Sequence, residues 1–232
     1  MARKDLGGTA GGYRGAVRAY AAVVLAGGAG RRMGGRDKPA LPVGGVPMRE
    51  RVLAAVGDAS PRILVGAGPA LAGVRLTREV PPGGGPVAAV AAGLALLDVD
   101  VPAVALLAAD LPLLTRSAVR QLLRHLDEAD LDRPAGSGDS FRTAGPGTGT
   151  DGACFVDASG RRQTLCGVWR PDALRTALDR LAGRRGELAG ASLRELLAGL
   201  AVREVTWTGD GLEPWFDCDT EGDVRRAEEW AR

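Results

Sequence analysis

The sequence predicts a single three-layer α/β/α domain whose central β-sheet is mostly parallel. Short apolar segments alternate with longer segments of helix-like pattern, which is typical of parallel strands joined by helical crossovers. The chain has 232 residues, of which 45% are hydrophobic, and this is enough to bury one substantial core. We therefore expect one α/β domain of ordinary size over residues 20–232.

Each predicted element follows from a local pattern. The apolar stretches that we interpret as strands are residues 21–26, 62–65, 74–77, 103–108, 153–156, 163–168 and 202–206. The predicted helices are residues 47–56, 86–97, 116–127, 171–181, 192–197 and 221–230. Pro47, Pro86 and Pro171 suit the first turn of a helix. Ser192 stands three residues before Glu195, which is a capping-box pattern at a helix start.

Two glycine-rich segments interrupt this rhythm. Residues 1–19 combine glycines with mixed charge, and we expect them to form a flexible N-terminal extension. Residues 132–150 place glycines among Ser, Thr and Pro and are longer than most loops of compact domains. We interpret them as a mobile surface loop. The alternative, a linker between two domains, is disfavoured because the segment after it has too few strands for a separate core.

Charge and cysteine content exclude several classes of protein. A formal net charge of +2 gives no large field of one sign, so binding to nucleic acid or to a membrane surface has no compositional support. Cys154, Cys166 and Cys218 are odd in number and widely spaced, which fits neither a disulfide framework nor a zinc site. With no continuous apolar signal segment and no run long enough to span a bilayer, we expect a cytoplasmic protein.

The most informative segment joins the first predicted strand to Lys38. An apolar run ending at Ala26 breaks into five closely placed glycines, and Arg31, Arg32 and Lys38 then supply positive charge. Closely placed glycines let backbone N–H groups approach an anion, so this is chemistry for holding phosphates. A glycine-rich surface loop is the alternative, since the chain contains 35 glycines. Composition alone does not place the basic residues in register behind a buried strand.

Two familiar phosphate loops are excluded by spacing. A Walker A loop needs Gly-Lys followed by Ser or Thr, whereas Lys38 follows Asp37 and precedes Pro39. A dinucleotide fingerprint starting at Gly28 would need a third glycine where Met33 stands. The segment therefore predicts a phosphate site of another kind.

A single carboxylate, Asp110, follows the apolar strand predicted over residues 103–108. Open α/β sheets bind their ligands at the carboxyl ends of the strands, so Asp110 is expected to face the same crevice as the glycine run. Mg²⁺ that accompanies nucleotide phosphates is usually held by one or two carboxylates. Asp110 is thus a candidate Mg²⁺ ligand. The alternative is a carboxylate that caps the turn ahead of Pro112.

The glycine run over residues 25–38 resembles the opening signature of the nucleotidyltransferase superfamily, Leu-Ala-Gly-Gly-x-x-x-Arg-Met-Gly-x-x-Lys, with one more residue before the lysine. Its Gly-Gly-x-Asp-Lys version is most similar to the molybdenum cofactor guanylyltransferases. The sequence Asp-Leu-Pro at 110–112 is similar to the family's Asp-x-Pro metal motif. The resemblance extends over roughly residues 21–231, with the motifs in the family's order. It implies a Rossmann-like, nucleotide-diphospho-sugar transferase-like fold.

The resemblance also implies roles for these residues. Backbone groups of the loop would hold the β- and γ-phosphates of the nucleotide, and Asp110 would hold Mg²⁺. Arg32 and Lys38 would offset charge on the leaving group. The implied phosphate-loop residues are Leu25, Ala26, Gly27, Gly28, Ala29 and Gly30.

A second segment, residues 80–89, resembles the family's Pro-Gly-x-Gly-Pro-Leu-Ala-Gly stretch beside the nucleoside. Gly85 and Pro86 are the matching binding positions, and Ala89 replaces the final glycine. Relatives also use an Asn and an acidic residue there. Glu79 is the acidic candidate in this chain, whereas the strand end at Val65 and Gly66 lacks the Asn.

The segment before the last predicted helix carries two further acidic residues. It resembles the family's Asn-x-Asn-Thr-Pro element, with Asp217 and Asp219 at the Asn positions and Glu221 in place of Pro. The resemblance makes Asp219, or else Asp217, a candidate second metal ligand. Without the family, the same residues form an acidic cluster that complements a helix start, with Thr220 as the cap. Both interpretations remain open at this point.

Residues 157–166 resemble a family hairpin, Asp-Gly-x-x-Gln-Pro-Leu, that faces the acceptor. Arg161 and Arg162 would then meet a phosphate of the acceptor. A solvated turn is the alternative, and the residues slightly favour it.

The implied activity is transfer of GMP from GTP to molybdopterin or its molybdenum-loaded form, with release of pyrophosphate and with Mg²⁺ as cofactor. Transient contact with the proteins that insert the cofactor is also implied. A cytidylyltransferase for the same pterin, or a guanylyltransferase for another phosphorylated acceptor, is the first alternative. The sequence Gly-Arg-Asp-Lys at 35–38 favours the guanylyl enzymes. A non-catalytic nucleotide-binding homologue is the second alternative, because Ala89, Asp217 and Asp219 depart from the family pattern.

Overall fold

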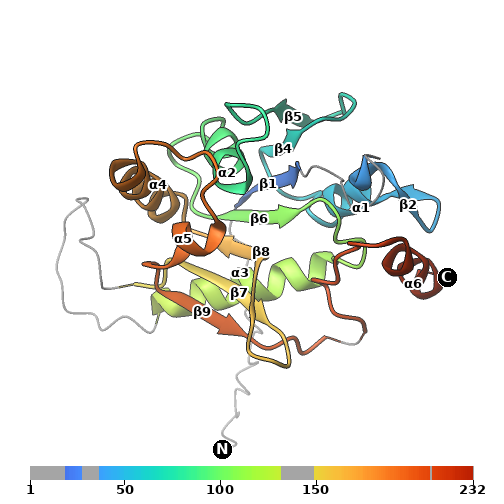
Figure 1. Ribbon diagram of the computed structural model, residues 1–232. Helices are drawn as coiled ribbons and strands as arrows, with labels where there is room; N and C mark the ends of the chain where they lie inside the picture. Colours follow the sequence, from blue (N-terminus) through green and yellow to red (C-terminus); the bar gives the residue numbers. More distant parts are fainter. Residues whose placement is uncertain (1–18, 28–36, 132–148, 210, 232) are drawn as a thin grey trace, which may run out of the picture.

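The structure is a computed structural model that describes residues 19–27, 37–131, 149–209 and 211–231. In these ranges seven strands form one sheet with the order β5-β4-β1-β6-β8-β7-β9 (Figure 1). Their bounds are β1 (Ala21–Ala26), β4 (Arg62–Gly66), β5 (Val74–Thr77), β6 (Val104–Ala108), β7 (Gly152–Val156), β8 (Arg162–Trp169) and β9 (Val202–Val205). Strand β8 runs antiparallel to β6 and β7, and the other neighbours are parallel. The predicted mostly parallel sheet is confirmed.

Helices cover both faces of the sheet, which gives the three layers expected from the sequence (Figure 1). The helices are α1 (Met48–Ala55), α2 (Pro86–Leu94), α3 (Arg116–Leu131), α4 (Pro171–Arg185), α5 (Leu193–Leu197) and α6 (Glu221–Trp230). Helices α1 and α3 pack on one face, and α2, α4 and α5 pack on the other. Alternate side chains of β1 enter the two cores. This double burial explains why β1 is a continuous apolar run.

A short β-ladder was not predicted. A two-stranded antiparallel ladder, β2 (Pro42–Val43) and β3 (Val46–Pro47), precedes α1 and packs with α6 around a small third core. Gly44 and Gly45 join its strands with φ of 61° and 75°, a conformation that glycine adopts at little cost. A Gly-Gly pair between two valines is the signal that sequence reasoning missed. As a consequence Pro47 ends β3 and caps α1, and the helix begins at Met48.

Several helix ends differ from the predicted bounds. Helix α2 stops at Leu94, before the predicted end at 97, whereas α3 and α4 extend beyond theirs to Leu131 and Arg185. The last turn of α4 carries Arg184 and Arg185, which suit a helix C-terminus but add nothing to an apolar periodicity. The predicted capping box of Ser192 and Glu195 is present at α5. None of the helices in the described ranges is long and apolar enough to cross a membrane.

Three predicted features fall largely or wholly outside the described residues. These are positions 1–18 of the extension, positions 132–148 of the glycine-rich loop, and the part of the phosphate loop over 28–36. The described chain resumes at Asp37, which precedes the 3₁₀ helix η2 (Lys38–Ala40).

Candidate functional site

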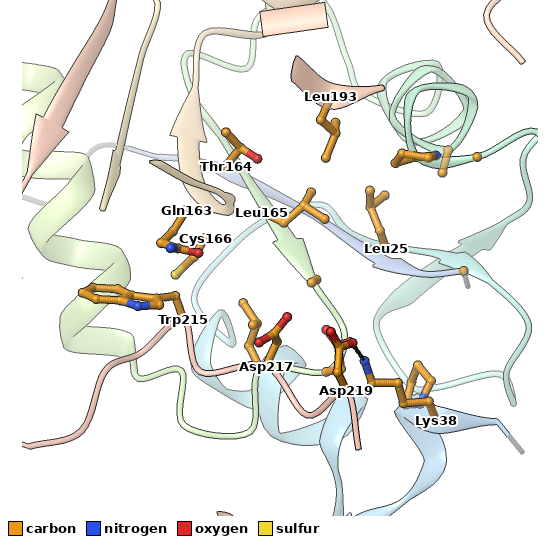
Figure 2. Close-up of a pocket in the computed structure, with 18 of the residues that line it drawn as sticks. Leu25, Lys38, Gln163, Thr164, Leu165, Cys166, Leu193, Trp215, Asp217 and Asp219 are labelled. Atoms are coloured by element: carbon orange, nitrogen blue, oxygen red, sulfur yellow. Dashed lines mark hydrogen bonds and ion pairs between the residues drawn. The ribbon is translucent and has the colours of Figure 1, made fainter. Parts of the chain in front are cut away.

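A cleft of about 950 Å³ opens beside the carboxyl ends of β1 and β6 (Figure 2). This volume and location are typical of ligand sites in open α/β folds. We call one side of it the carboxylate half, lined by Leu25, Gly27, Lys38, Glu79, Gly85, Pro86, Asp110, Asp217 and Asp219. We call the opposite side the hairpin half. It is lined by the first residues of β8, by the residue that precedes β8 and by a tryptophan: Arg161, Arg162, Gln163, Thr164, Leu165, Cys166 and Trp215.

Lys38 is the centre of the carboxylate half. Its Nζ lies 2.5 Å from Oδ2 of Asp110 and 2.7 Å from Oδ1 of Asp219. Figure 2 shows Lys38 and Asp219 pointing toward each other across the cleft floor. Three segments far apart in the sequence, namely η2, the end of β6 and the segment before α6, therefore meet at one ammonium group. Sequence reasoning expected Lys38 to face phosphates and did not foresee these two partners.

Backbone hydrogen bonds bring the carboxylates together. The amide of Ala109 donates to the carbonyl of Leu25 at 3.0 Å, which continues the β1–β6 pairing to the residue before Asp110. The amide of Cys218 donates to the carbonyl of Asp110 at 3.2 Å, which holds the segment before α6 against the end of β6. Asp219 thus reaches the same cation as Asp110 because its neighbour is anchored to the Asp110 backbone.

Electrostatics in this half are coupled. Burial by itself would lower the pKa of Lys38, but hydrogen bonds and ion pairs with Asp110 and Asp219 outweigh it and raise that pKa above its ordinary value. Burial, followed by the negative charges of Asp219 and Asp110, raises the pKa of the nearby Asp217 carboxyl. The carboxylate half therefore concentrates negative charge around one held cation.

The structure shows which residues of the acidic segment before α6 cap that helix. Thr220 is the N-cap, and its capping box is completed by Asp223, whose carboxylate accepts from the Thr220 amide at 2.8 Å. Capping is therefore accomplished by Thr220 and Asp223. The carboxylate of Asp219 instead accepts from Lys38.

The segment over residues 80–89 borders the same half. Glu79 accepts a hydrogen bond from the amide of Gly83 at 3.1 Å, and Gly85 is the N-cap residue from which α2 starts at Pro86. Gly66, the last residue of β4, has a φ of 136°, and an added Cβ would lie 2.8 Å from the carbonyl carbon of Ala26. A side chain at 66 would therefore collide with the backbone at the end of β1.

A buried arginine that sequence reasoning missed lies behind η2. Arg49 of α1 donates from Nη1 to Oδ2 of Asp37 at 2.7 Å, and its side chain is 8% exposed. The position falls on the buried side of α1, beside Val52 and Leu53 of the same helix, where an apolar residue is the usual choice. A charged residue at a buried helix position was the available signal.

The hairpin half is organised by Asp157. Its Oδ1 accepts from the amide of Ser159 at 2.9 Å and the amide of Arg161 at 3.0 Å, and its Oδ2 accepts from Gln163 at 2.9 Å. The hydrogen bond from the Ser159 hydroxyl is the largest of the effects that lower the pKa of the Asp157 carboxyl. Arg162 pairs with Glu204 at 2.8 Å. The turn therefore presents Arg161 and the start of β8 to the cleft from a locally bonded frame.

The structure gathers most of the predicted site residues that it describes. Leu25, Gly27, Lys38, Glu79, Gly85, Pro86, Asp110 and Asp219 all line the cleft. Ala26 ends β1 next to it and is nearly buried. Gly28, Ala29, Gly30 and Arg32 lie outside the described residues.

The acidic side chains that line the cleft are candidate metal ligands. No group of three or more His, Cys, Asp or Glu side chains arranged to hold a metal occurs within the four described ranges. Two carboxylates, Asp110 and Asp219, nevertheless converge on one cationic atom. Because Mg²⁺ commonly takes one or two carboxylates and completes its shell with phosphates and water, this pair fits such an ion when nucleotide is present.

Comparisons with known proteins agree with this geometry. A curated molybdenum cofactor guanylyltransferase from Nitrobacter hamburgensis is 29% identical over 226 residues, covering 90% of this chain and 93% of the relative. The molybdopterin-guanine dinucleotide biosynthesis protein A of Archaeoglobus fulgidus superposes with a TM-score of 0.62 at 20% identity, over 90% of this chain and 96% of that one.

A 2-C-methyl-D-erythritol 4-phosphate cytidylyltransferase from Thermus thermophilus also superposes with a TM-score of 0.62 at 20% identity, over 92% of this chain and 98% of that one. These two structural likenesses show the fold. The family model of the MobA-like NTP transferase domain matches residues 22–203, which is most of the chain and includes Lys38, Asp110 and all of β1 but its first residue. The resemblance seen in the motifs is thereby confirmed, and the chain belongs to the MobA-like NTP transferase family.

Proposed function

We propose that this protein is a Mg²⁺-dependent guanylyltransferase that transfers GMP from GTP to the terminal phosphate of molybdopterin or its molybdenum-loaded form. The observation that carries the proposal is the ammonium of Lys38 held between Asp110 and Asp219, beside Leu25 and Gly27 at the carboxyl edge of the sheet. Family membership and the guanylyltransferase from Nitrobacter hamburgensis support the choice of nucleotide and acceptor.

The chemistry is a substitution at the α-phosphorus of GTP. A phosphate oxygen of the acceptor forms a bond to this phosphorus as the bond to the β-phosphate oxygen breaks and pyrophosphate leaves. Positioning and neutralisation of charge dominate the catalysis of such transfers. An acceptor phosphate is already ionised at neutral pH, so the reaction needs no general base from the chain.

The residues divide this task. Backbone N–H groups of residues 26–30, together with Leu25, would hold the β- and γ-phosphates, while Glu79, Gly85 and Pro86 border the nucleoside. Lys38 and Arg32 would offset charge on the departing pyrophosphate. The raised pKa of Lys38 keeps it protonated for this role at neutral pH.

Asp110 and Asp219 are the residues that would hold Mg²⁺, which when bound supplies further neutralisation of triphosphate charge. Lys38 then has to share or leave these carboxylates when metal and nucleotide enter. Across the cleft, Arg161 provides positive charge on the side where the acceptor would approach.

We further propose that residues 20–232 act as one nucleotidyltransferase domain, with 1–19 and 132–150 as appended segments. The reaction would take place in the cytoplasm and include transient contact with proteins that insert the cofactor. The net charge of +2 supports small-molecule substrates over nucleic acid or a membrane surface.

The decisive experiment measures pyrophosphate release in steady state with each of GTP, CTP, ATP and UTP, together with Mg²⁺ and molybdopterin. GTP should support turnover, and chelation of divalent cations should abolish it. Calorimetry should rank GTP as the tightest nucleotide. Equal or stronger binding and turnover with CTP would overturn the guanylyl assignment, and absence of turnover with every nucleotide would indicate the non-catalytic homologue.

A further inference from the structure

We infer that Arg49 is a positioning residue for Lys38: its buried guanidinium holds Asp37, and Asp37 in turn fixes the turn from which Lys38 reaches the cleft. Arg49 lies outside the cleft lining. The inference rests on the proposed function only in the experiment that measures turnover. Its geometric part stands independently.

Arg49 is unusually buried for a charged residue. It belongs to α1 and is 7% exposed, one of two buried polar or charged residues among those described. Its Nη1 donates to Asp37, whereas its Nε is buried with no hydrogen-bond partner in the described part of the chain. A buried guanidinium with such incomplete pairing costs stability, and a methionine of similar length would be the cheaper residue. Stability therefore does not explain the arginine.

Asp37 connects Arg49 to the start of η2. It is the N-cap of η2 with φ of −67° and ψ of 88°, and its carbonyl accepts from the amide of Ala40 at 2.9 Å. Its side chain makes no capping hydrogen bond to η2 and is bonded to Arg49 instead. Because Lys38 directly follows, the anchor at Asp37 sets the direction in which the Lys38 side chain leaves the backbone.

Lys38 has to reach two carboxylates at once. Its Nζ must lie within hydrogen-bond distance of two carboxylates that come from separate segments. Only two of the 30 lysines and arginines in the chain are lysines, Lys4 and Lys38. In a chain that uses arginine almost everywhere, a compact and flexible ammonium stands at this position. A flexible side chain needs its backbone held if it is to sit in one place.

The pair is asymmetric, and the asymmetry makes the inference testable. Asp37 has a side chain that is 45% exposed, whereas that of Arg49 is 8% exposed. Arg49→Met leaves a solvated carboxylate behind and should lower Tm little. Asp37→Ala leaves a buried charge unpaired and should lower Tm by at least about 5 °C.

The first measurement is independent of activity. Reductive methylation with ¹³C-formaldehyde labels the N-terminal amine, Lys4 and Lys38, and Lys38→Arg assigns the Lys38 signal by removing it. In the parent protein this signal should be shifted from that of a solvated lysine by its two carboxylates. Arg49→Met should move it toward the solvated position, and Arg49→Lys should restore part of the shift. Arg120→Met, which removes an Arg–Asp pair with Asp58, is the matched control and should leave it unchanged.

The second measurement is a double-mutant cycle on pyrophosphate release from GTP. Arg49→Met should lower kcat by about 10- to 10²-fold, the size expected for a displaced catalytic group, with little change in the KM of the acceptor. In a Lys38→Ala background the same substitution should have almost no further effect on kcat. Arg49→Lys should recover part of the loss.

Two results would overturn the inference: an unchanged Lys38 signal in Arg49→Met, or a kcat loss from Arg49→Met that is equally large without Lys38. If the parent protein turns over no nucleotide, the proposed function fails, and the labelled Lys38 signal still decides whether Arg49 positions this residue.

Discussion

The two halves of the cleft are built in opposite ways. In the carboxylate half, Lys38 and its partners Asp110 and Asp219 come from segments far apart, and Lys38 and Asp219 are separated by 181 positions in the sequence. In the hairpin half, the hydrogen bonds of Asp157 reach only residues up to six positions away. The first half therefore exists only when the whole sheet has formed, whereas the turn of the second half is held by local hydrogen bonds.

This difference indicates where precision is needed. The carboxylate half places several like charges around one cation in a half-buried site, where each misplaced group costs much. The hairpin half presents exposed arginine side chains, whose contacts in water are individually weak. We expect substitutions in the first half to affect kcat strongly and those in the second to act modestly, mainly on acceptor affinity.

The largest effect is expected for Asp110→Ala. Removing this carboxylate takes away one of the two groups that accept hydrogen bonds from Lys38 and that, in the proposed function, would hold Mg²⁺. Turnover should fall by about 10³-fold or more, with the circular dichroism spectrum unchanged. Near-normal pyrophosphate release by the folded variant at limiting Mg²⁺ would reduce Asp110 to a turn residue.

The next effect is expected for Lys38→Ala. An ammonium that neutralises charge on leaving pyrophosphate is worth more in the transition state than in the bound substrate, so kcat should fall by about 10²–10³-fold, or about 2.7–4 kcal/mol. Lys38→Arg should recover only part of this, because guanidinium is larger and planar. Separate KM values for GTP and acceptor are the check. A change confined to the acceptor KM would assign Lys38 to the acceptor.

A smaller effect is expected in the hairpin half. Arg161→Ala should raise the KM of the acceptor several-fold and leave the KM of GTP unchanged, since Arg161 lies across the cleft from Lys38. Arg124→Ala, on α3 and outside the cleft lining, is a control of the same type. Equal effects of both variants would return Arg161 to the solvated turn that the residues alone slightly favoured.

The pH dependence of the hairpin provides a related test. Hydrogen bonds from Ser159 and Arg161 lower the pKa of Asp157, so its folded-state pKa lies below the unfolded value. The stabilisation it provides is then present above the unfolded pKa, about 3.9, and is lost as pH falls through the lower folded value. The protection factor of the Arg161 amide, which is its intrinsic exchange rate at a given pH divided by the observed rate, should therefore persist at pH 4 and fall at pH values well below it. Asp157→Asn should remove this pH dependence.

The smallest effect is expected for Thr220→Ala. Loss of the N-cap of α6 should cost about 1 kcal/mol, or about 2–4 °C in Tm. Because Asp219 directly precedes the cap, turnover should fall slightly as well. Ser192→Ala removes the matching capping box at α5 and should cost similar stability without that loss of turnover. Equal turnover in both variants would show that the cap of α6 does not help to position Asp219.

Much of the fold could be predicted from local pattern. Strands β1 and β5 and helix α6 match their predicted bounds, because burial and capping act over a few residues. The β2–β3 ladder was missed because its strands are two residues each, too short for any periodicity. The placement of Asp110 at the ligand edge followed from its position after β6, since parallel strands end at one edge.

The sequence by itself determined the order of the main strands and helices along the chain and the family, and it predicted most of the described residues that line the carboxylate half of the cleft. Tertiary structure alone decided which of them meet: that Lys38 binds Asp110 and Asp219, that Gly66 leaves no room for a side chain, and that Arg49 is buried against Asp37. Local pattern reports how each segment partitions between water and core. Contacts between charged side chains from distant segments depend on how the sheet and helices pack, which a single sequence does not encode in any local signal.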